Sequence, residues 1–234
     1  MNRLFLHFLF VLAFGLLLAC GGQQAKKEGA EKKTQQEKGQ EQPRKSIVFF
    51  GNSLTAGYGV EPGQAFPALA QKRIDSLGLG YTVVNAGLSG ETTASGVNRV
   101  DWVISQQPVD IFVLELGGND GLRGIEVGET QKNLELIIEK VRAKYPKATV
   151  VLAGMMVPPN MGPTYSKAFK AIFPRVAEKA KVMLIPFILE NVGGEKELNQ
   201  EDGIHPTPEG HKLVLENVWP VLKGAIELKT GGPL

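Results

Sequence analysis

The sequence predicts an α/β fold, in which one domain is built around a five-stranded parallel sheet with helices on both faces. Five short apolar runs rich in β-branched residues recur along the chain, helix-like segments separate them, and Pro and Gly mark the junctions. Strands that are apolar on both sides and alternate with helices are typical of a parallel sheet covered on both faces.

The predicted strands and helices follow one another in strict alternation. The strands are expected at residues 46–50, 81–85, 109–116, 149–155 and 182–187, and the helices at residues 66–77, 92–107, 129–144, 166–181 and 207–228. The clearest helix is 129–144, whose apolar residues follow i, i+3, i+4, i+7 spacing: Leu134, Ile137, Ile138 and Val141. In such sheets ligands bind beyond the carboxyl ends of the strands, so the loops after the strands should carry the functional residues.

The composition indicates one domain of ordinary size and gives no electrostatic case for nucleic-acid binding. The chain has 234 residues, 43% of them hydrophobic, which is ample for a packed core. Lys and Arg number 26 against 24 Asp and Glu, and the resulting net charge of +2 is too small to attract a phosphate backbone. The single cysteine, Cys20, rules out an intramolecular disulfide, and nothing in the sequence indicates an oligomeric state.

The start of the chain predicts a secretory leader. Asn2 and Arg3 open a short positive region, and the almost unbroken apolar run at 4–19 is shorter than the roughly 18–20 residues of a membrane-spanning helix. Residues 17–20, LLAC, resemble the bacterial lipoprotein processing box, in which the cysteine becomes the lipid-bearing first residue. The alternative is an ordinary cleaved signal peptide in which Cys20 is incidental.

Residues 21–45 are rich in Gln, Glu, Lys and Gly, and we expect a disordered tether that spans roughly 25–30 Å. A helix is the alternative, although it would have no apolar stripe to pack. The expected organisation is therefore a lipoprotein signal peptide at 1–19, a lipidated Cys20 and linker at 20–45, the folded domain at 46–228 and a tail at 229–234. The expected location is the bacterial cell envelope, lipid-anchored on the periplasmic or outer-membrane side, with a membrane as partner.

Two distant segments suggest an activated hydroxyl nucleophile. Ser53 follows the first expected strand, and Asp202 precedes His205 by three residues near the end of the chain. A serine met by a histidine that an acid orients is the arrangement of a Ser-His-Asp triad. The alternatives are that Ser53 only caps a helix, and that the other two residues form a surface turn or a metal pair.

The small number of histidines strengthens this interpretation. The chain has three, and His7 lies in the expected leader, so acid–base chemistry must use His205 or His211. We expect His211, within the last helix, to be solvated. A third metal ligand of suitable spacing is missing from the sequence around Asp202 and His205, so no metal is expected.

Two further positions can stabilise a developing oxyanion. The side-chain amide of Asn119, in a glycine-rich segment after the third strand, can donate a hydrogen bond. Gly90, after the second strand, can offer its backbone N–H beside a helix N-terminus. The alternatives are a plain turn with Asn119 in the left-handed region, a helix start capped by Ser89 or Thr92, and a phosphate or metal role for Asp120.

Several other enzyme classes lack their signatures. No G-x-S-x-G surrounds Ser53, so the common α/β-hydrolase arrangement is not indicated. Neither a Walker-type loop nor a G-x-G-x-x-G follows the first strand, and no cofactor is expected.

Taken in order, these segments resemble the SGNH (GDSL-type) hydrolase family, and most closely its bacterial thioesterase/arylesterase/lysophospholipase branch. The four blocks that carry the resemblance are residues 50–55 (FGNSLT), 85–92 (NAGLSGET), 117–120 (GGND) and 202–206 (DGIHP), and residues 114–124 point to the branch.

The resemblance implies a flavodoxin-like three-layer α/β/α sandwich with strand order 2-1-3-4-5. It also implies that Ser53, Asp202 and His205 are catalytic and that the Ser53 amide, Gly90 and Asn119 form the oxyanion hole. The family usually has Asp immediately before the serine, whereas this chain has Asn52, so the hydrogen bonding around the serine and the pH profile are expected to differ.

The expected function is therefore a membrane-anchored serine esterase that hydrolyses carboxylic esters of small molecules or lipids through an acyl-serine intermediate. The apolar, methionine-containing loop 155–161, together with Leu122 and Ile125, favours fatty-acyl, lysophospholipid or aryl esters as substrates. The alternative is that these residues belong to the hydrophobic core at the end of the sheet. The alternatives are an envelope-glycan O-deacetylase with a smaller acyl pocket and a non-catalytic binding lipoprotein on the same fold.

Overall fold

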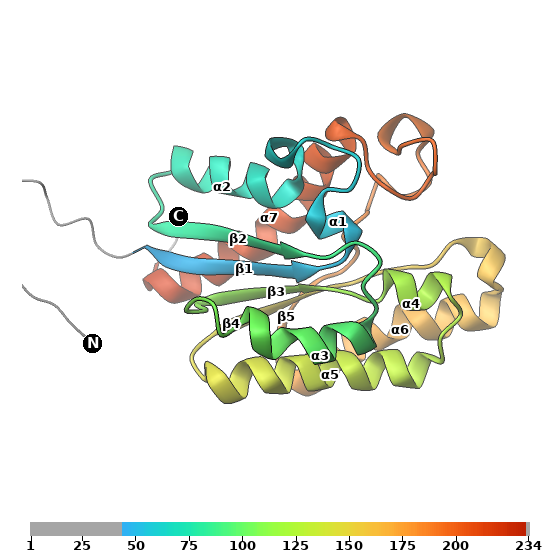
Figure 1. The fold of residues 1–234 in the computed structure, drawn as a ribbon, viewed down its shortest axis with the longest axis horizontal. Helices are drawn as coiled ribbons and strands as arrows, with labels where there is room; N and C mark the ends of the chain where they lie inside the picture. Colours follow the sequence, from blue (N-terminus) through green and yellow to red (C-terminus); the bar gives the residue numbers. More distant parts are fainter. Residues whose placement is uncertain (1–43, 233–234) are drawn as a thin grey trace, which may run out of the picture. The chain divides into compact units, whose positions relative to one another are not determined.

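The structure is a computed structural model that describes residues 44–232. Its centre is a sheet of five parallel strands in the order β2-β1-β3-β4-β5, which confirms the predicted flavodoxin-like fold (Figure 1). The strands are β1 (Lys45–Gly51), β2 (Tyr81–Gly87), β3 (Ile111–Glu115), β4 (Thr149–Ala153) and β5 (Met183–Ile185). The expected signal peptide, Cys20 and nearly all of the expected linker lie outside the described residues.

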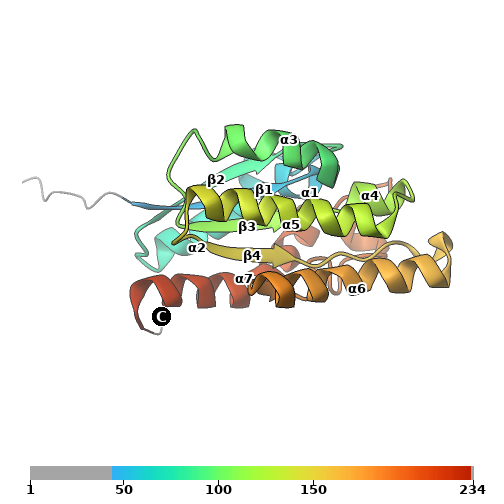
Figure 2. The same ribbon diagram turned by 90° about the horizontal axis from the view of Figure 1, so that it is seen from below.

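Helices cover both faces of this sheet. Helices α2 (Phe66–Ser76) and α7 (Pro208–Thr230) pack together on one face, and α3 (Thr93–Val103), α5 (Val127–Lys144) and α6 (Pro163–Ala180) lie on the other (Figures 1 and 2). All five were predicted within a few residues. Helix α6 starts earlier than expected because Pro163 occupies its first turn, where proline is favourable. Helix α7 runs past residue 228 and ends at Gly231 in the left-handed region.

Strand β1 is buried on both sides, as its unbroken apolar sequence predicts. Successive side chains point to opposite faces, so Phe49 packs edge-on against Phe66 of α2 at 5.5 Å between ring centroids. Phe50 stacks on Phe112 of β3 at 5.5 Å. Both phenylalanines of β1 are fully buried, and the carboxyl end of the strand is therefore a rigid support for whatever follows it.

Two short helices that the sequence analysis did not predict follow β1 and β3. Helix α1 (Ser53–Ala56) comes after β1 and α4 (Gly118–Leu122) after β3, and each is too short to be stable alone. The chain leaves β1 for β2 on one side and returns to β3 on the other, so both helices begin at the point where the strand order reverses. Three 3-10 turns complete the structure: η1 (Pro62–Gln64), η2 (Pro159–Met161) and η3 (Lys196–Leu198).

Candidate active site

The structure brings Ser53, His205 and Asp202 together at the carboxyl ends of the strands. Nε2 of His205 lies 2.8 Å from Oγ of Ser53, although 152 residues separate them in the sequence. Nδ1 of the same imidazole lies 2.6 Å from Oδ2 of Asp202. With Nδ1–H donating to the carboxylate, the lone pair of Nε2 faces the serine hydroxyl, which is the geometry that a general base needs. Their catalytic roles stay a prediction.

We call residues 51–55 the nucleophile elbow, because the chain turns there from β1 into α1. Asn52, and not Ser53, is the N-cap of α1, and its Oδ1 accepts from the Leu54 N–H at 2.9 Å. The alternative that Ser53 is a helix cap is therefore wrong. Gly57 ends the helix in the left-handed region at φ 77°. Ser53 is consequently the first helical residue, with its hydroxyl turned toward His205.

We call residues 200–206 the base-bearing turn. Oδ1 of Asp202 accepts from the backbone N–H groups of Ile204 and His205, each at 3.0 Å. Partial burial works to raise the pKa of Asp202, but these two hydrogen bonds and the one from the His205 ring outweigh it and hold the pKa below its usual value. The surface turn named as an alternative in the sequence analysis thus exists, and it orients the histidine.

Two residues that the sequence analysis did not include in the site, Gln200 and Tyr58, stabilise the base-bearing turn. The backbone N–H of Gln200 donates to the His205 carbonyl at 2.8 Å, and its side-chain amide donates to the Tyr58 carbonyl at 2.7 Å. The Tyr58 ring lies on the His205 ring with 4.6 Å between centroids. The sequence offered no signal for these contacts, because Gln200 and Tyr58 lie far apart along the chain.

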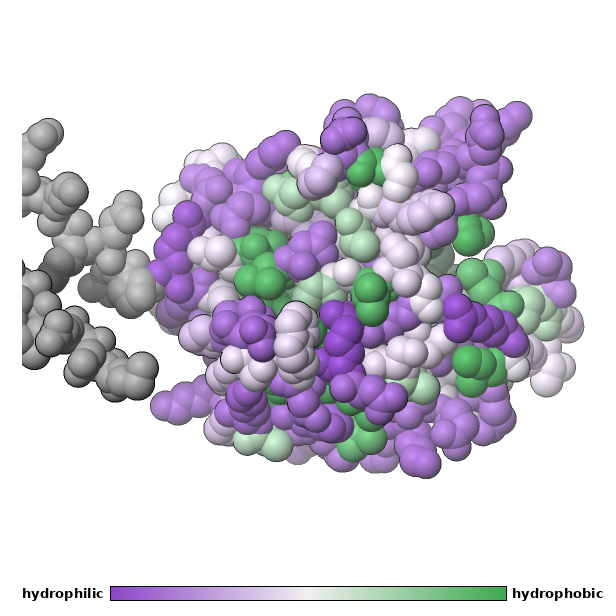
Figure 3. Space-filling model, in the orientation of Figure 1, coloured by the Kyte–Doolittle hydropathy of each residue, from purple (hydrophilic) through white to green (hydrophobic). Residues whose placement is uncertain are grey.

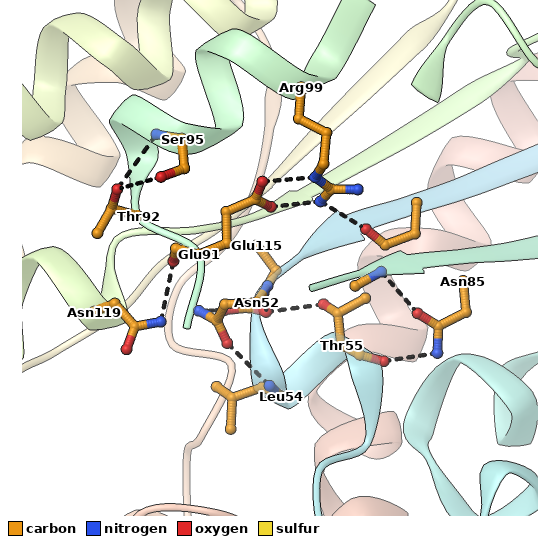
Figure 4. Close-up of polar contacts among 12 residues, drawn as sticks. Asn52, Leu54, Thr55, Asn85, Glu91, Thr92, Ser95, Arg99, Glu115 and Asn119 are labelled. Carbon is orange, nitrogen blue, oxygen red and sulfur yellow. Dashed lines mark hydrogen bonds and ion pairs between the residues drawn. The ribbon is translucent and has the colours of Figure 1, made fainter. Parts of the chain in front are cut away.

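The candidate oxyanion donors lie beside Ser53. Asn119 is the second residue of α4, and it is Gly117, not Asn119, that adopts the left-handed region, with φ 115°. The Asn119 side-chain amide donates one hydrogen bond to the Glu91 carbonyl at 3.0 Å, which leaves its second N–H available (Figure 4). Within residues 44–232, neither the Ser53 nor the Gly90 backbone N–H donates to a protein acceptor.

A buried ion pair supports the loop that carries Gly90. Glu91 has a fully buried carboxylate, which Arg99 of α3 binds through two nitrogens (Figure 4). Arg99 also donates to the Ala86 carbonyl at 2.9 Å and lies over the Phe50 ring. Thr92 caps α3, as one of the sequence-based alternatives proposed. The loop after β2 is therefore tied to the sheet and to α3 at the same time.

His211 differs from the prediction. We expected a solvated helical residue, but it is 1% exposed and packs between α7 and α2. Its Nδ1 accepts from the Phe66 N–H at 3.3 Å, so the ring is neutral with its proton on Nε2. Burial, with a smaller effect from nearby His205, lowers the pKa of His211 to about 4. It sits on the buried face of α7, which periodicity alone did not indicate.

Asp120, for which a phosphate or metal role was an alternative, has a structural role in the fold. It is fully buried, and its Oδ2 accepts from the Thr93 N–H at 2.9 Å. It therefore joins α4 to the start of α3 and does not face the cavity. Among residues 44–232, no group of three or more His, Cys, Asp or Glu side chains is arranged to hold a metal ion.

Ser53, Asn119 and His205 open into one cavity of about 540 Å³. Its apolar wall includes Leu122, Met155 and Met156, as the sequence analysis suggested, but Ile125 is not part of it. Phe187 and Leu189, after β5, also line it and were not foreseen. The end of the molecule at which the strands terminate also carries exposed hydrophobic residues among hydrophilic ones (Figure 3). This volume is that of a pocket for a small organic ligand.

The sequence matches a known hydrolase family and several named esterases. The model described as the GDSL-like Lipase/Acylhydrolase family matches residues 49–213. The chain is 42% identical to esterase TesA of Pseudomonas aeruginosa over 184 residues, covering 79% of this chain and 90% of the esterase. It is 37% identical to an arylesterase of Vibrio mimicus over 177 residues, covering 76% and 88% of the two chains.

The thioesterase 1/protease 1/lysophospholipase L1 of Escherichia coli K12 is 35% identical over 171 residues, with 73% of this chain and 80% of that protein covered. Among solved structures, the crystal structure of TesA superposes with a TM-score of 0.74 over 77% of this chain and 99% of that one. The region matched by the family model, residues 49–213, includes every residue of the candidate site.

Proposed function

This chain belongs to the GDSL-like lipase/acylhydrolase family and is a carboxylic ester hydrolase, and from that premise we propose that it cleaves fatty-acyl, lysophospholipid or aryl esters through an acyl–Ser53 intermediate. The observation that carries the proposal is the 2.8 Å contact between Oγ of Ser53 and Nε2 of His205, which both line a largely apolar cavity. It joins two residues that lie 152 positions apart in the sequence.

Acylation follows from this contact. His205 takes the hydroxyl proton as Oγ of Ser53 attacks the ester carbonyl, and the imidazolium then returns a proton to the departing alcohol oxygen. Asp202, 2.6 Å from Nδ1, keeps the imidazole in the required tautomer and stabilises its positive charge. Water activated by the same imidazole then attacks the acyl–serine bond and releases the carboxylic acid.

The oxyanion of each tetrahedral intermediate is held by the backbone N–H groups of Ser53 and Gly90 and by the free N–H of the Asn119 side chain. The first two have no protein acceptor within residues 44–232. One such donor is typically worth about 2.7–4 kcal/mol of the activation barrier. The Asn119 amide is already fixed by its bond to Glu91, so little reorganisation is needed when negative charge develops.

The lining of the cavity supports an apolar acyl group. Large apolar side chains at its mouth are exposed, with Tyr58 at 53%, Leu122 at 41% and Ile204 at 40%. An exposed apolar rim is unfavourable in water unless it binds something apolar. Met155 and Met156 are flexible and can adapt to acyl groups of different shape. These features favour fatty-acyl or aryl esters over acetylated glycans.

We further propose that Cys20 is lipidated and that the enzyme is anchored in the bacterial cell envelope. The support is the LLAC sequence after a short apolar run. Among residues 44–232, none of the helices combines the length and apolarity needed to cross a bilayer. Membrane fractionation of wild type and Cys20→Ala tests the anchor: release of the variant supports it, and retention on the membrane contradicts it.

Labelling by a fluorophosphonate probe tests the enzymatic proposal. Wild type should be labelled and Ser53→Ala should not, because the probe reacts only with an activated serine. An unlabelled wild type would favour a non-catalytic binding protein. A series of p-nitrophenyl esters from acetyl to palmitoyl then tests the substrate class, and activity confined to the acetyl ester would favour a deacetylase instead.

A further inference from the structure

Tyr58, between α1 and η1, has no part in the proposed mechanism, although it contacts the residue that acts as base in it. Its ring centroid lies 4.6 Å from that of His205, with 42° between the two ring planes. Tyr58 also lines the cavity and is 53% exposed. One part of the ring therefore lies on the imidazole, and the rest is accessible to a molecule that enters the cavity.

The backbone of Tyr58 is fixed. Its N–H donates to the Ser53 carbonyl at 3.0 Å, and its carbonyl accepts from the Gln200 side-chain amide at 2.7 Å. Gly57 before it and Gly59 after it have φ of 77° and 76°, in the left-handed region that favours glycine. A Cβ at position 59 would lie 2.0 Å from Oε1 of Gln200. Tyr58 is therefore held between the nucleophile elbow and the base-bearing turn.

The nucleophile elbow is fixed to the sheet as well. Glu115, the last residue of β3, is 1% exposed and shares three hydrogen bonds with the elbow. They join its carboxyl group to the Asn52 N–H at 3.2 Å, to the Asn52 side-chain amide at 2.9 Å and to the Thr55 hydroxyl at 2.8 Å (Figure 4). Because Ser53 and Tyr58 both have fixed backbones, an ester that reacts at Ser53 meets the Tyr58 ring in a defined place.

The reaction itself decides which part of an ester lies beside His205. In the proposed mechanism Nε2 of His205 gives a proton to the departing alcohol oxygen, so that oxygen lies within hydrogen-bond distance of Nε2. The carbonyl oxygen points instead to the N–H groups of Gly90 and Asn119. The group on the alcohol oxygen then extends along the His205 ring, where Tyr58 and Ile204 line the cavity. Tyr58 therefore faces the alcohol part of the ester.

The side chains in this region favour an aromatic alcohol. Ile204, next to His205 in the sequence, is 40% exposed and adds an apolar surface. Aromatic rings bind each other in offset or edge-on arrangements more tightly than their buried area alone predicts. Among residues 44–232, neither a Lys nor an Arg lines the cavity, so the phosphate of a lysophospholipid would have no cationic partner there.

We propose that Tyr58 and Ile204 form an alcohol subsite that binds an aromatic ring, and that an aromatic alcohol uses it both as leaving group and as acyl acceptor. The acceptor role follows because a step and its reverse pass through the same transition state. The alcohol oxygen attacks the carbonyl carbon of acyl–Ser53 while its proton passes to Nε2 of His205. The bond from that carbon to Oγ of Ser53 then breaks, and Oγ takes the proton back, which leaves a new ester and the free enzyme.

This inference rests on the proposed function, since it needs an acyl–Ser53 intermediate. It narrows the alcohol part of the substrate to aromatic alcohols and adds acyl transfer as a second reaction. Tyr58 is a specificity-determining residue that binds the alcohol, and it exchanges no proton with it.

Two butyrate esters test the leaving-group role. Benzyl and cyclohexylmethyl butyrate have alcohols of similar size and acidity, and both give the same acyl–Ser53, so a difference in kcat/KM arises before the alcohol departs. With the rates of alkaline hydrolysis divided out, wild type should prefer the benzyl ester by about two- to ten-fold, the advantage of an aromatic pair. Tyr58→Ala should bring this ratio to about one, and Tyr58→Phe should keep it.

Leu122→Ala is the matched control. Leu122 lines the same cavity and is 41% exposed, but it belongs to α4, which carries Asn119 on the oxyanion side. This variant should lower kcat/KM for both esters alike and keep their ratio. The subsite is overturned if wild type shows no preference, if Tyr58→Ala keeps the wild-type ratio, or if Leu122→Ala loses the ratio to the same extent.

A competition between alcohol and water tests the acceptor role. Wild type is supplied with p-nitrophenyl butyrate and equal concentrations of benzyl alcohol or cyclohexylmethanol, and the new ester is measured against butyric acid. Benzyl alcohol should give about two- to ten-fold more ester per acid released, and Tyr58→Ala should remove this difference. The yield is counted per acyl–Ser53, so a general loss of activity does not change it. Equal yields in wild type, or no new ester, overturn the acceptor role.

Two further measurements complete the test. If Tyr58→Ala does not fold, Tyr58→Leu, which keeps bulk without a ring, gives the same comparison and the same expected loss of preference. Fluorophosphonate labelling of wild type separates the subsite from the proposed function. An unlabelled wild type contradicts the enzyme itself, whereas a labelled wild type that treats the two alcohols alike contradicts only the subsite.

Discussion

The two halves of the candidate active site are built in different ways. The nucleophile elbow is held by buried groups, since Asn52 is 2% exposed and Glu115 1% exposed. On the base-bearing turn the Asp202 side chain is 38% exposed and that of His205 16%. The elbow is joined to the sheet by side-chain bonds, whereas the turn is ordered mainly by bonds to its own backbone.

This difference suggests a division of labour. In the proposed mechanism, the serine and the oxyanion donors must keep fixed positions relative to each other, and buried polar contacts at the ends of strands provide that. In the same mechanism, the histidine must exchange protons with a leaving group and with water, which requires access to solvent. We therefore expect damage to the elbow side to affect both folding and rate, and damage to the turn to affect mainly rate.

The largest expected effect comes from removing either reacting group. Ser53→Ala and His205→Ala should each lower kcat/KM by at least about 10⁴-fold, and the double variant should be hardly worse, because the two residues act as a unit. Steady-state kinetics on a p-nitrophenyl ester measure this. Strictly additive losses in the double variant would contradict a shared mechanism.

The second prediction concerns the buried ion pair on the elbow side. Arg99→Ala leaves the Glu91 carboxylate buried without a partner and should destabilise the fold by about 3–5 kcal/mol. The matched control is Arg73→Ala, which breaks the exposed pair with Glu216 and should cost less than about 1 kcal/mol. Urea unfolding of both variants measures the difference, and equal losses would remove the contrast between buried and exposed contacts.

The third prediction concerns His211, the buried histidine of α7. The pKa of His211 is about 4 in the fold and its ordinary value is 6.5. Its neutral form therefore stabilises the protein fully above pH 6.5, and that contribution is lost as pH falls from 6.5 toward 4.

A shift of this size corresponds to about 3 kcal/mol. Unfolding free energies at pH 7 and pH 4.5, for wild type and His211→Gln, test it. Wild type should lose more stability over this range than the variant, and parallel pH profiles would show that His211 does not carry the effect.

The smallest expected effect is on the base-bearing turn. Gln200→Ala removes side-chain hydrogen bonds to the Tyr58 and Pro206 carbonyls and should cost about 1 kcal/mol in stability. We expect kcat to fall a few-fold, because His205 becomes less well oriented. Tyr58→Phe keeps the ring on His205 and is the control that should behave as wild type. A Gln200→Ala variant as unstable as Arg99→Ala would break the comparison between the two halves.

Much of the fold could be predicted because its signals are local. Strands β1, β3, β4 and β5 consist mainly of consecutive apolar residues, and α5 follows the helical spacing over most of its length. The short helices α1 and α4 could not be predicted, because they depend on caps and on contacts from distant strands and not on their own sequence. His211 was misassigned for a related reason, since its burial depends on α2 packing against α7.

The residues that meet in the candidate site could be predicted from their chemistry, but the residues that hold them in position could not. Ser53 and His205 stood out because few residue types perform this chemistry and histidines are scarce. Glu115 left one signal, an acid within an apolar strand, which indicates a buried partner without identifying it. That partner depends on the register between β1 and β3, which places Gly51 opposite Glu115.

The long separation in the sequence between the proposed nucleophile and the proposed base has a practical consequence. Everything from β1 to β5 carries the serine and the oxyanion donors, while the base-bearing turn and α7 form one continuous C-terminal segment. A cut in the stretch between Ile185 and Asn199 would therefore yield two fragments, neither of which holds a complete catalytic set. If the two fragments were fused to two proteins that associate, hydrolysis of a p-nitrophenyl ester would report that association.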